Sequence, residues 1–268
     1  MKAISVIFIV AKYPATYGHT SVINNLCHGL NELGHKTAIG AFSFDNDPPK
    51  GIEKVILKKN ELLRSGVASL KYDIIHPHQA QVLYYLLFKK PEKPIVFHYH
   101  AASNMIQELN LKSSMKLFKK RISKFISVSE KASHHLEELA GKCDDVVIYN
   151  GVDTKFFHPD LDQPYRKGTP QLLFLSVLRR YKKTVDLIDA MPELLKTYPK
   201  AHLQIVGNGE DFSRLQNIIK KKNLEKNIEM TGRIDDEELR LRYASCDMYV
   251  SASTDRKSTR LNSSHVKR

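Results

Sequence analysis

The feature that most constrains the fold is the alternation of short apolar segments with longer segments of helical periodicity. The apolar segments include SVIFIVA, PIVFHYH, QLLFLSV and AHLQIVG. Apolar runs of this kind are typical of parallel strands that helices cover on both faces. The helical segment before Gly34 places Leu26, Leu30 and Leu33 on one face, and glycine is a common helix end. The pattern predicts an α/β protein with doubly wound parallel sheets.

One segment interrupts the alternation of strand and helix. Residues 150–171 contain three prolines and several turn-forming residues but no periodic apolar face. We therefore expect two Rossmann-like domains that face each other across a substrate cleft. The predicted boundaries are 1–150 for the first domain, 151–170 for the linker, 171–254 for the second domain and 255–268 for a tail.

The charge of the chain indicates the kind of partner it takes. The 268 residues carry a net charge of +13, and the excess is not confined to the tail. Such an excess favours an anionic partner, which includes a nucleotide, other phosphate groups and an acidic membrane surface. A non-catalytic basic module that binds nucleic acid is an alternative that charge alone leaves open.

Cysteine spacing and hydropathy indicate a cytoplasmic protein. Cys27, Cys143 and Cys246 are too widely spaced for a disulfide framework or a metal motif, and they fit a reducing compartment. The apolar run 4–11 is too short to span a bilayer and fits a first buried strand. We expect cytoplasmic localisation, with peripheral contact at the inner face of the cell membrane.

Polar residues and glycines gather where the predicted strands end. Ligands of open parallel sheets bind beyond the carboxyl ends of the strands, so these residues are the candidates for the site. In the first domain they include Gly18, His76, His78, His98, His100 and Asn150, and in the second Arg179, Arg180, Lys182, Gly207, Gly209 and Arg233.

Three of these signals have two interpretations each. The G-x-G of Gly207 and Gly209 is a tight turn or a phosphate site. The basic run 179–183 is a solvated loop or, because it precedes a helix, a diphosphate site. The pairs His76/His78 and His98/His100 each point to one face of a strand, as metal chelation requires. No Cys, Asp or Glu stands at matching spacing, so we expect hydrogen bonds to sugar or phosphate and no metal.

Segment 111–124 combines an apolar helical face with a basic surround. The apolar face consists of Leu111, Met115, Phe118 and Ile122, and the basic residues are Lys112, Lys116, Lys119, Lys120 and Arg121. The helix either packs one face on the sheet and leaves the cations in solvent, or also presents them to anionic lipid headgroups. The two interpretations are compatible, because a packed helix still presents a basic rim.

Several motifs occur together in one order. The most specific is NGVDTKFFHP at 150–159, similar to the linker motif NGVD-x3-F-x-P, and DIIHPH, FISVSE and KKTVDLIDAM match further blocks. Through these motifs, residues from about 1 to 254 resemble the retaining glycosyltransferases of family 4, the glycosyl transferase group 1 type with a GT-B fold. The resemblance implies that the first domain binds the acceptor and the second binds the nucleotide.

The resemblance also implies the reaction. Members of this family move a sugar from a nucleotide diphosphate sugar to a glycan, lipid-linked or other acceptor, with retention and usually without a metal. We therefore expect a nucleotide-sugar donor as co-substrate, no cofactor and no nucleic-acid partner. A GT-B nucleotide-sugar epimerase or sugar phosphorylase is the alternative within the same fold.

Site roles carry over by position. Lys182 takes the place of the lysine that neutralises the departing diphosphate, and His100 that of a strand-end histidine near the donor sugar. The partner arginine of the family falls at Val177, so Arg179 or Arg180 is its substitute. The remaining donor-side candidates are Gly18, Gly207, Gly209 and Arg233, and the acceptor-side candidates are His76, His78, Glu130 and Asn150.

The tail departs from the family pattern. After VSAS at 250–253 the family continues into an E-x7-E segment that anchors the donor, whereas this chain reads DRKSTRLNSSH. That stretch resembles the translation of a sequencing-adapter oligonucleotide, and a disordered basic tail is the alternative. We interpret residues 255–268 as non-native and residues 171–254 as a partial domain. We therefore expect this truncated chain to be unstable or inactive, although its gene encodes a glycosyltransferase.

Overall fold

The computed structural model describes residues 2–15, 18–102 and 104–253. The chain divides into two compact units at Val152/Asp153, a position inside the segment 151–170 that the sequence assigns to the linker. The predicted tail 255–268 lies outside the described residues.

The first unit is built on a parallel sheet. Its strands are β1 (Ser5–Tyr13), β2 (Lys36–Phe44), β3 (Glu53–Ile56), β4 (Ile74–Pro77), β5 (Val96–Tyr99), β6 (Lys124–Ser127) and β7 (Asp145–Val147). They run in the order β3-β2-β1-β4 and β5-β6-β7, and a parallel bridge between Ile75 and Ile95 joins the two groups. The carboxyl ends of β4 and β5 therefore lie next to each other.

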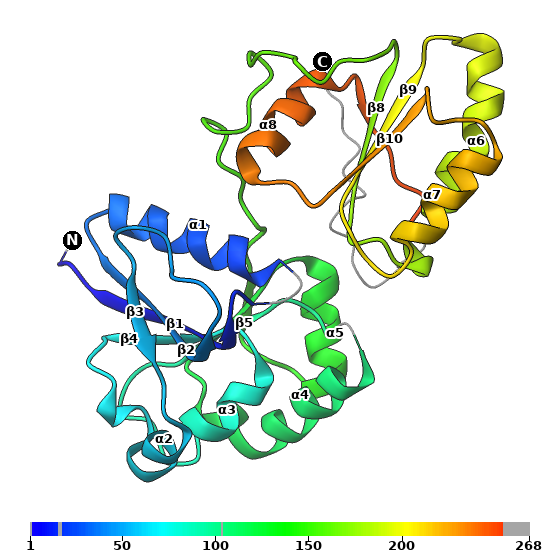
Figure 1. Cartoon of the computed structure of the whole chain (residues 1–268). Coiled ribbons are helices and arrows are strands. Elements are labelled where there is room, and N and C mark those ends of the chain that lie inside the picture. Colours follow the sequence, from blue (N-terminus) through cyan, green and yellow to red (C-terminus); the bar gives the residue numbers. More distant parts are fainter. Residues whose placement is uncertain (1, 16–17, 103, 254–268) are drawn as a thin grey trace. The chain divides into compact units, whose positions relative to one another are not determined.

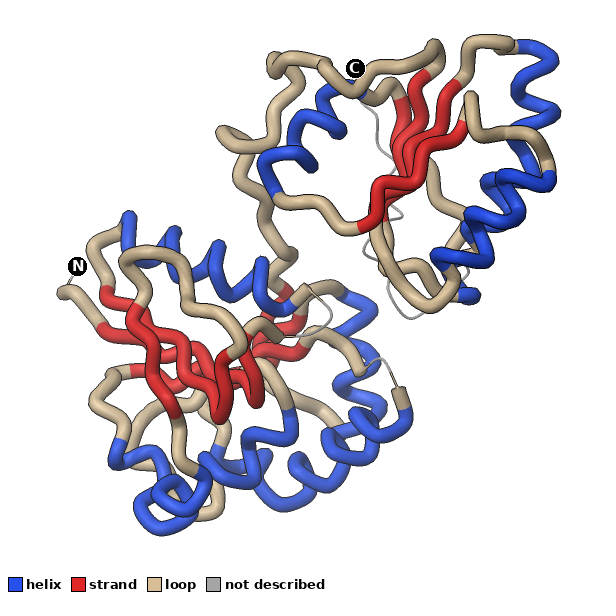
Figure 2. The backbone as a smooth tube through the Cα atoms, in the orientation of Figure 1, coloured by secondary structure: helices blue, strands red, loops and turns tan. Residues whose placement is uncertain are grey.

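Helices cover both faces of this sheet (Figures 1 and 2). They are α1 (His19–Glu32), α2 (Lys59–Ser65), α3 (Ala80–Leu86), α4 (Met105–Phe118) and α5 (Glu130–Ala140), with short 3-10 turns η1 (Gly66–Ser69) and η2 (Lys119–Arg121). Successive residues of β1 enter opposite cores: Ile7 and Ile9 pack on the side of α3 to α5, and Phe8 packs on the side of α1. This explains the unbroken apolar run of β1 and confirms the doubly wound α/β prediction.

The prediction of which residues form the apolar face of α1 is partly wrong. The residues of α1 that are fully buried are Ile23 and Cys27, whereas Leu26 and Leu30 pack only at the edge of that core. Leu33 is the C-cap of the helix and is 74% exposed. The inward face is therefore rotated from the leucine row, because a small thiol and a β-branched side chain fit closer to the sheet.

The second unit has a smaller parallel sheet in the order β10-β9-β8-β11 (Figure 2). Its elements are β8 (Gln171–Leu175), η3 (Arg180–Lys182), α6 (Thr184–Thr197), β9 (His202–Val206), α7 (Phe212–Lys221), β10 (Ile228–Gly232), α8 (Asp236–Ser245) and β11 (Met248–Tyr249). Phe174 and Ile205 pack with Ile188 of α6 and Leu215 of α7 in an apolar core.

Polar groups fill much of the side of this sheet that lies toward α8. Arg242 of α8 is buried, forms an ion pair with Glu238 and lies 4.2 Å from the ring centroid of Tyr165. Gln204 of β9 is buried and donates to the carbonyl oxygen of Tyr165. Among the described helices of the whole chain, none has the length and apolar composition that crossing a bilayer requires.

Candidate active site

Four of the predicted histidines form one stack at the carboxyl ends of β4 and β5. The ring centroids are 4.8 Å apart for His76–His78, 4.7 Å for His78–His98 and 4.6 Å for His98–His100. Residues i and i+2 of a strand point to the same face, and β4 is the neighbour of β5, so the four rings converge. Nδ1 of His78 lies 2.8 Å from Nε2 of His100, which is a hydrogen bond.

A fifth histidine extends this stack. The ring of His19 lies 4.2 Å from that of His100, nearly parallel to it. His19 is the first residue of α1, and Gly18 before it has a φ of 78°, which favours glycine. Sequence reasoning identified Gly18 but missed His19, although a polar residue at a helix start beyond β1 was a usable signal.

Three rings of the stack, those of His76, His78 and His98, are buried. Burial, assisted by His98, lowers the pKa of His76 to about 3, and burial, assisted by His19, lowers the pKa of His98 to about 4. The pKa of His78 also lies well below its ordinary value because of burial and the neighbouring histidines. These three imidazoles are therefore neutral near pH 7 and offer lone pairs and N–H groups rather than positive charge.

The other acceptor-side candidates lie further along the same sheet edge. Glu130 begins α5 just beyond β6, and Asn150 follows β7, and both are exposed. In the strand order, β6 and β7 come after β5, so the structure separates these residues from the histidines of β4.

Backbone hydrogen bonds bring the loops beyond β8, β9 and β10 together in the second unit. The amide of Leu178 donates to the carbonyl of Asn208 at 3.0 Å, and the amide of Gly207 donates to the carbonyl of Gly232 at 2.8 Å. The predicted donor-side residues Arg179, Gly207, Gly209 and Arg233 follow these strands and so lie at one end of the sheet.

The two glycines of the G-x-G motif permit this close approach. A Cβ on Gly207 would lie 1.9 Å from the carbonyl oxygen of Ser176, and one on Gly209 would lie 2.2 Å from that of Leu178. Gly207 also has a φ of 130°. The tight-turn interpretation thus has a direct structural reason, and phosphate contact by this loop stays a prediction.

The basic run 179–183 forms the entry to α6. Lys182 lies in η3, with its Nζ 5.1 Å from the ring centroid of Tyr181, and Lys183 caps α6 with a φ of 49°. Thr184 follows, is 3% exposed, and its Oγ1 has no hydrogen-bond partner among the described residues. A helix N-terminus with adjacent cations and no side-chain cap attracts anions.

Segment 111–124 packs as predicted, and its cations have different roles. Leu111, Met115, Phe118 and Ile122 are buried. Lys119 donates to the carbonyl oxygens of Ala140 and Lys142, and Arg121 donates to those of Leu87 and Phe88, so these two cations stabilise the fold.

A different face of α4 is exposed and partly apolar. We call this the α4 outer face, and it consists of Met105, Ile106, Leu109, Lys112, Lys116 and Leu117. At 100° per residue these side chains lie within about 140° of the helix circumference. The sequence predicted the lysines of this face and missed its four exposed apolar residues.

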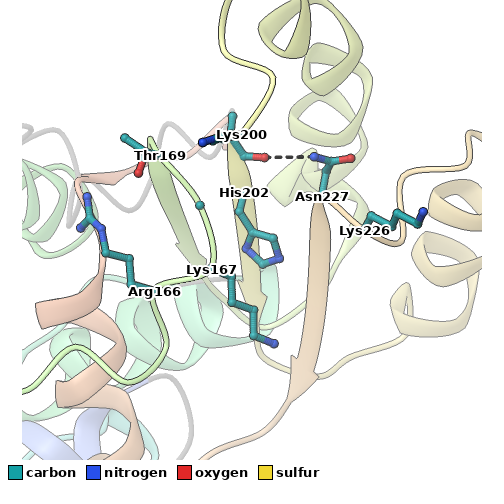
Figure 3. A pocket seen from close by; sticks show the side chains of 9 residues that line it. Arg166, Lys167, Thr169, Lys200, His202, Lys226 and Asn227 are labelled. Carbon is teal, nitrogen blue, oxygen red and sulfur yellow. Dashed lines mark hydrogen bonds between the residues drawn. The ribbon is translucent and has the colours of Figure 1, made fainter.

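A separate basic pocket of about 400 Å³ lies at the amino ends of β8, β9 and β10 (Figure 3). It is lined by Lys167, Lys200, His202 and Lys226 among others. Lys167 has Glu229 as an ion-pair partner at 3.0 Å, and in Figure 3 the Lys226 side chain extends away from the His202 ring. The pocket is at the opposite sheet end from the predicted site.

Comparison with known proteins places this geometry in a family. The family model of Glycosyltransferase Family 4 matches residues 17–156, and that of Glycosyl transferases group 1 matches residues 160–257. Alpha-monoglucosyldiacylglycerol synthase of Acholeplasma laidlawii is 24% identical over 92% of this chain and 74% of its own length. Phosphatidyl-myo-inositol mannosyltransferase of Mycolicibacterium smegmatis is 29% identical over 70% of this chain, which spans about half (49%) of that relative.

Solved structures show the same fold at low identity. A glycosyltransferase from Rickettsia africae superposes with a TM-score of 0.72 at 18% identity, covering 94% of this chain and 74% of that one. Anabaena Alr3699/HepE in complex with UDP-glucose gives a TM-score of 0.72 at 18% identity, covering 95% and 75%. These likenesses confirm the GT-B fold predicted from the sequence, and the chain belongs to glycosyltransferase family 4.

Proposed function

We propose that the protein transfers a sugar from a nucleotide diphosphate sugar to a lipid acceptor at a membrane surface, with retention of anomeric configuration. The observation that carries the proposal is the N-terminus of α6, which follows β8. Lys182 lies beside this helix start, and the N-cap residue Lys183 makes no side-chain hydrogen bond to its amides. The relatives named above act on diacylglycerol-based and phosphatidylinositol lipids, and one solved structure holds UDP-glucose.

The donor's diphosphate lies at the start of α6 in this proposal. As the bond to the sugar breaks, negative charge grows on the diphosphate, and Lys182 and the α6 amides stabilise it. The hydroxyl of Thr184 is buried there, has no hydrogen-bond partner in the described part of the chain, and donates to the same group in this proposal. Lys182, the α6 amides and the Thr184 hydroxyl balance the negative charge of the departing diphosphate, so we expect transfer without a metal.

Arg179 is the better substitute for the arginine that the family pattern would place at Val177. Val177 is 57% exposed and carries no charge. Arg179 is half-buried in extended backbone, and hydrogen bonds of the adjacent Leu178 tie its loop to Asn208 and Asp211. Arg180 is exposed, so fixing its position on a diphosphate would lose more side-chain entropy.

His100 faces the reacting sugar in this proposal. Its ring is held on one side by the hydrogen bond to His78 and on the other by stacking against His19. A ring with one nitrogen hydrogen-bonded and one face stacked is oriented before the substrate arrives, which favours reaction geometry.

The acceptor reaches the protein at a membrane that the α4 outer face contacts. Its apolar side chains are strongly exposed, with Met105 at 74% and Ile106 at 71%. Lys112 and Lys116 stand on the same face, and each cation near an anionic lipid surface adds about 1 kcal/mol. Apolar insertion and headgroup attraction together are typical of peripheral helices.

The experiment that tests the proposal is calorimetric titration of the chain with UDP and with GDP, which probes the diphosphate site at the start of α6 without requiring turnover. We expect one diphosphate-dependent site, and Lys182→Ala to weaken binding by roughly 10- to 100-fold, as loss of a charged hydrogen bond does. Lys196→Ala is the matched control, since Lys196 is an exposed lysine in the last turn of the same helix, away from the α6 N-terminus. Equal loss in both variants, or binding that ignores the diphosphate, would contradict the proposal.

A further inference from the structure

We propose that His76, His78 and His98 form a binding site for a transition-metal ion of borderline softness, with Zn²⁺ as the reference ion. The site lies in the first unit, next to His100, and does not involve the donor diphosphate proposed above. The expectation of metal-independent transfer is compatible with it, because the ion is held by three buried rings and not by donor phosphates.

The first support is a group of buried nitrogens that lack hydrogen bonds. The side chains of His76, His78 and His98 are 8%, 2% and 3% exposed. Within the described part of the chain, Nε2 of His76, Nε2 of His78 and both ring nitrogens of His98 have no partner. Buried polar atoms in proteins are nearly always paired, and a cluster of four exceptions points to a missing ligand.

A metal ion satisfies these atoms better than a further hydrogen bond does. A neutral imidazole has one donor and one acceptor nitrogen, so stacked rings enclosed by apolar groups have few mutual pairings. An ion takes one lone pair from each ring at a single point. Imidazole ligands without carboxylates favour Zn²⁺, Co²⁺, Ni²⁺ and Cu²⁺ over Mg²⁺ and Ca²⁺.

The ligand nitrogens of the three rings lie near one another, although farther apart than in an occupied three-histidine site. One ligand nitrogen from each ring lies within 4.8 Å of the others. Zinc–nitrogen bonds are about 2.0–2.1 Å, so nitrogens that share a tetrahedral zinc lie roughly 3.4 Å apart. Because the ring planes lie 21–30° from one another, ligation also requires the rings to turn about their side-chain bonds until their in-plane lone pairs meet at the ion. Three protein ligands also leave a fourth position for water.

The contact between His78 and His100 fits the same assignment. His78 places Nδ1 against Nε2 of His100 at 2.8 Å, and when this Nδ1–H donates, Nε2 of His78 keeps its lone pair for the ion. Metal-bound histidines commonly use the second nitrogen in this way.

The sequence alone favours no metal here, because no Cys, Asp or Glu stands at matching spacing to either H-x-H pair. The third ligand comes from the neighbouring strand, since the bridge Ile75–Ile95 sets β4 beside β5. Buried water is the competing way to satisfy the same nitrogens, and it predicts no response to added metal.

The test is titration of the untagged, metal-stripped chain with Co²⁺, followed by its visible absorption, and then competition with Zn²⁺. We expect one Co²⁺ per chain, the intense bands of a tetrahedral site, and their loss on addition of Zn²⁺. His98→Asn should weaken Co²⁺ binding at least about 10-fold, whereas His134→Asn, which changes an exposed histidine of α5, should leave it unchanged. Equal binding by both variants, or only the weak bands of an octahedral complex, would overturn the site.

Because His98→Asn removes a buried ring and can unfold the unit, a second readout uses the wild-type chain. Imidazole ¹⁵N spectra should show three histidines whose nitrogens shift together with one equivalent of Zn²⁺, with His134 and His28 unmoved. Shifts confined to exposed histidines such as these two would refute the proposal whatever the variant does.

Discussion

Gly207→Ala should be the most damaging glycine substitution in the second unit, because Gly207 combines two constraints. Its φ of 130° is unfavourable for alanine, and strain of this kind is typically about 1–3 kcal/mol. The new Cβ would also lie 1.9 Å from the carbonyl oxygen of Ser176, so the loops beyond β8 and β9 must separate.

The separation has a calculable cost. It removes the hydrogen bond from the amide of Ser176 to the carbonyl of Val206, and the displacement of Gly207 removes the one from its amide to the carbonyl of Gly232. At roughly 0.5–1.5 kcal/mol each, with the strain added, the loss is about 2–6 kcal/mol. Since domains are stable by about 5–15 kcal/mol, Gly207→Ala should remove a large part of the stability of this unit.

Two other glycines of the same unit separate the constraints. Gly209→Ala places a Cβ 2.2 Å from the carbonyl oxygen of Leu178, but Gly209 has no positive φ. We expect the free energy of unfolding to fall by about 1–3 kcal/mol, because the two backbone hydrogen bonds of Leu178 with residues 208 and 211 are disturbed. Gly232→Ala has a φ of 74° and no atom within 4 Å, so strain alone should cost about 1–2 kcal/mol.

The assay is urea unfolding of the three variants and wild type, with hydrogen exchange of peptides from 171–253 to assign the loss to the second unit. We expect the largest loss for Gly207→Ala and a weaker affinity for UDP in the same variant, because the loop that holds Arg179 moves. A Gly207→Ala protein no less stable than Gly232→Ala would refute the packing argument.

Three further predictions concern the first unit. Leu109→Glu should reduce binding to anionic vesicles about 10-fold or more, because it removes inserted apolar surface. Leu33→Glu, at the exposed C-cap of α1, should leave this binding unchanged. Equal binding of both variants would contradict membrane contact by the α4 outer face. Lys116→Glu should weaken the same binding by about 2 kcal/mol at low salt and by less in high salt, measured by vesicle sedimentation. Thermal stability should be constant above about pH 6.5 and should fall as the pH drops from 6.5 toward about 4. The reason is that His76 and His98 have folded pKa values of about 3 and 4, so in this range these histidines bind protons in the unfolded chain and not in the folded one. Each such histidine contributes up to about 1.4 kcal/mol per pH unit, and melts without slope in this range would contradict neutral buried rings.

The strands and the parallel sheet were predictable because burial on both faces leaves a direct mark on sequence. Ile7, Phe8 and Ile9 enter two cores alternately, so no polar residue interrupts β1 between Val6 and Ala11. The same reasoning failed for Leu33, because a row of leucines does not reveal where a helix ends or which side chains fit closest to a sheet.

The candidate site was predictable only in part. Strand-end position identified His76 and His100, but not their stacking with His19, which depends on where α1 begins relative to β4 and β5. The exposed leucines of α4 were missed because periodicity was used to find a buried face, and Leu109 does not belong to it. Gly207 was read as a turn or phosphate signal, and its contact with Ser176 is visible only once two loops meet.

The most direct measurement is a crystal structure of the chain soaked with UDP-glucose or UDP. We predict the diphosphate against the first amides of α6, within hydrogen-bond distance of Lys182 and of the Thr184 hydroxyl. Density for the diphosphate in the basic pocket of Lys167, Lys200 and His202 (Figure 3), at the amino ends of the strands, would contradict the account of the donor site.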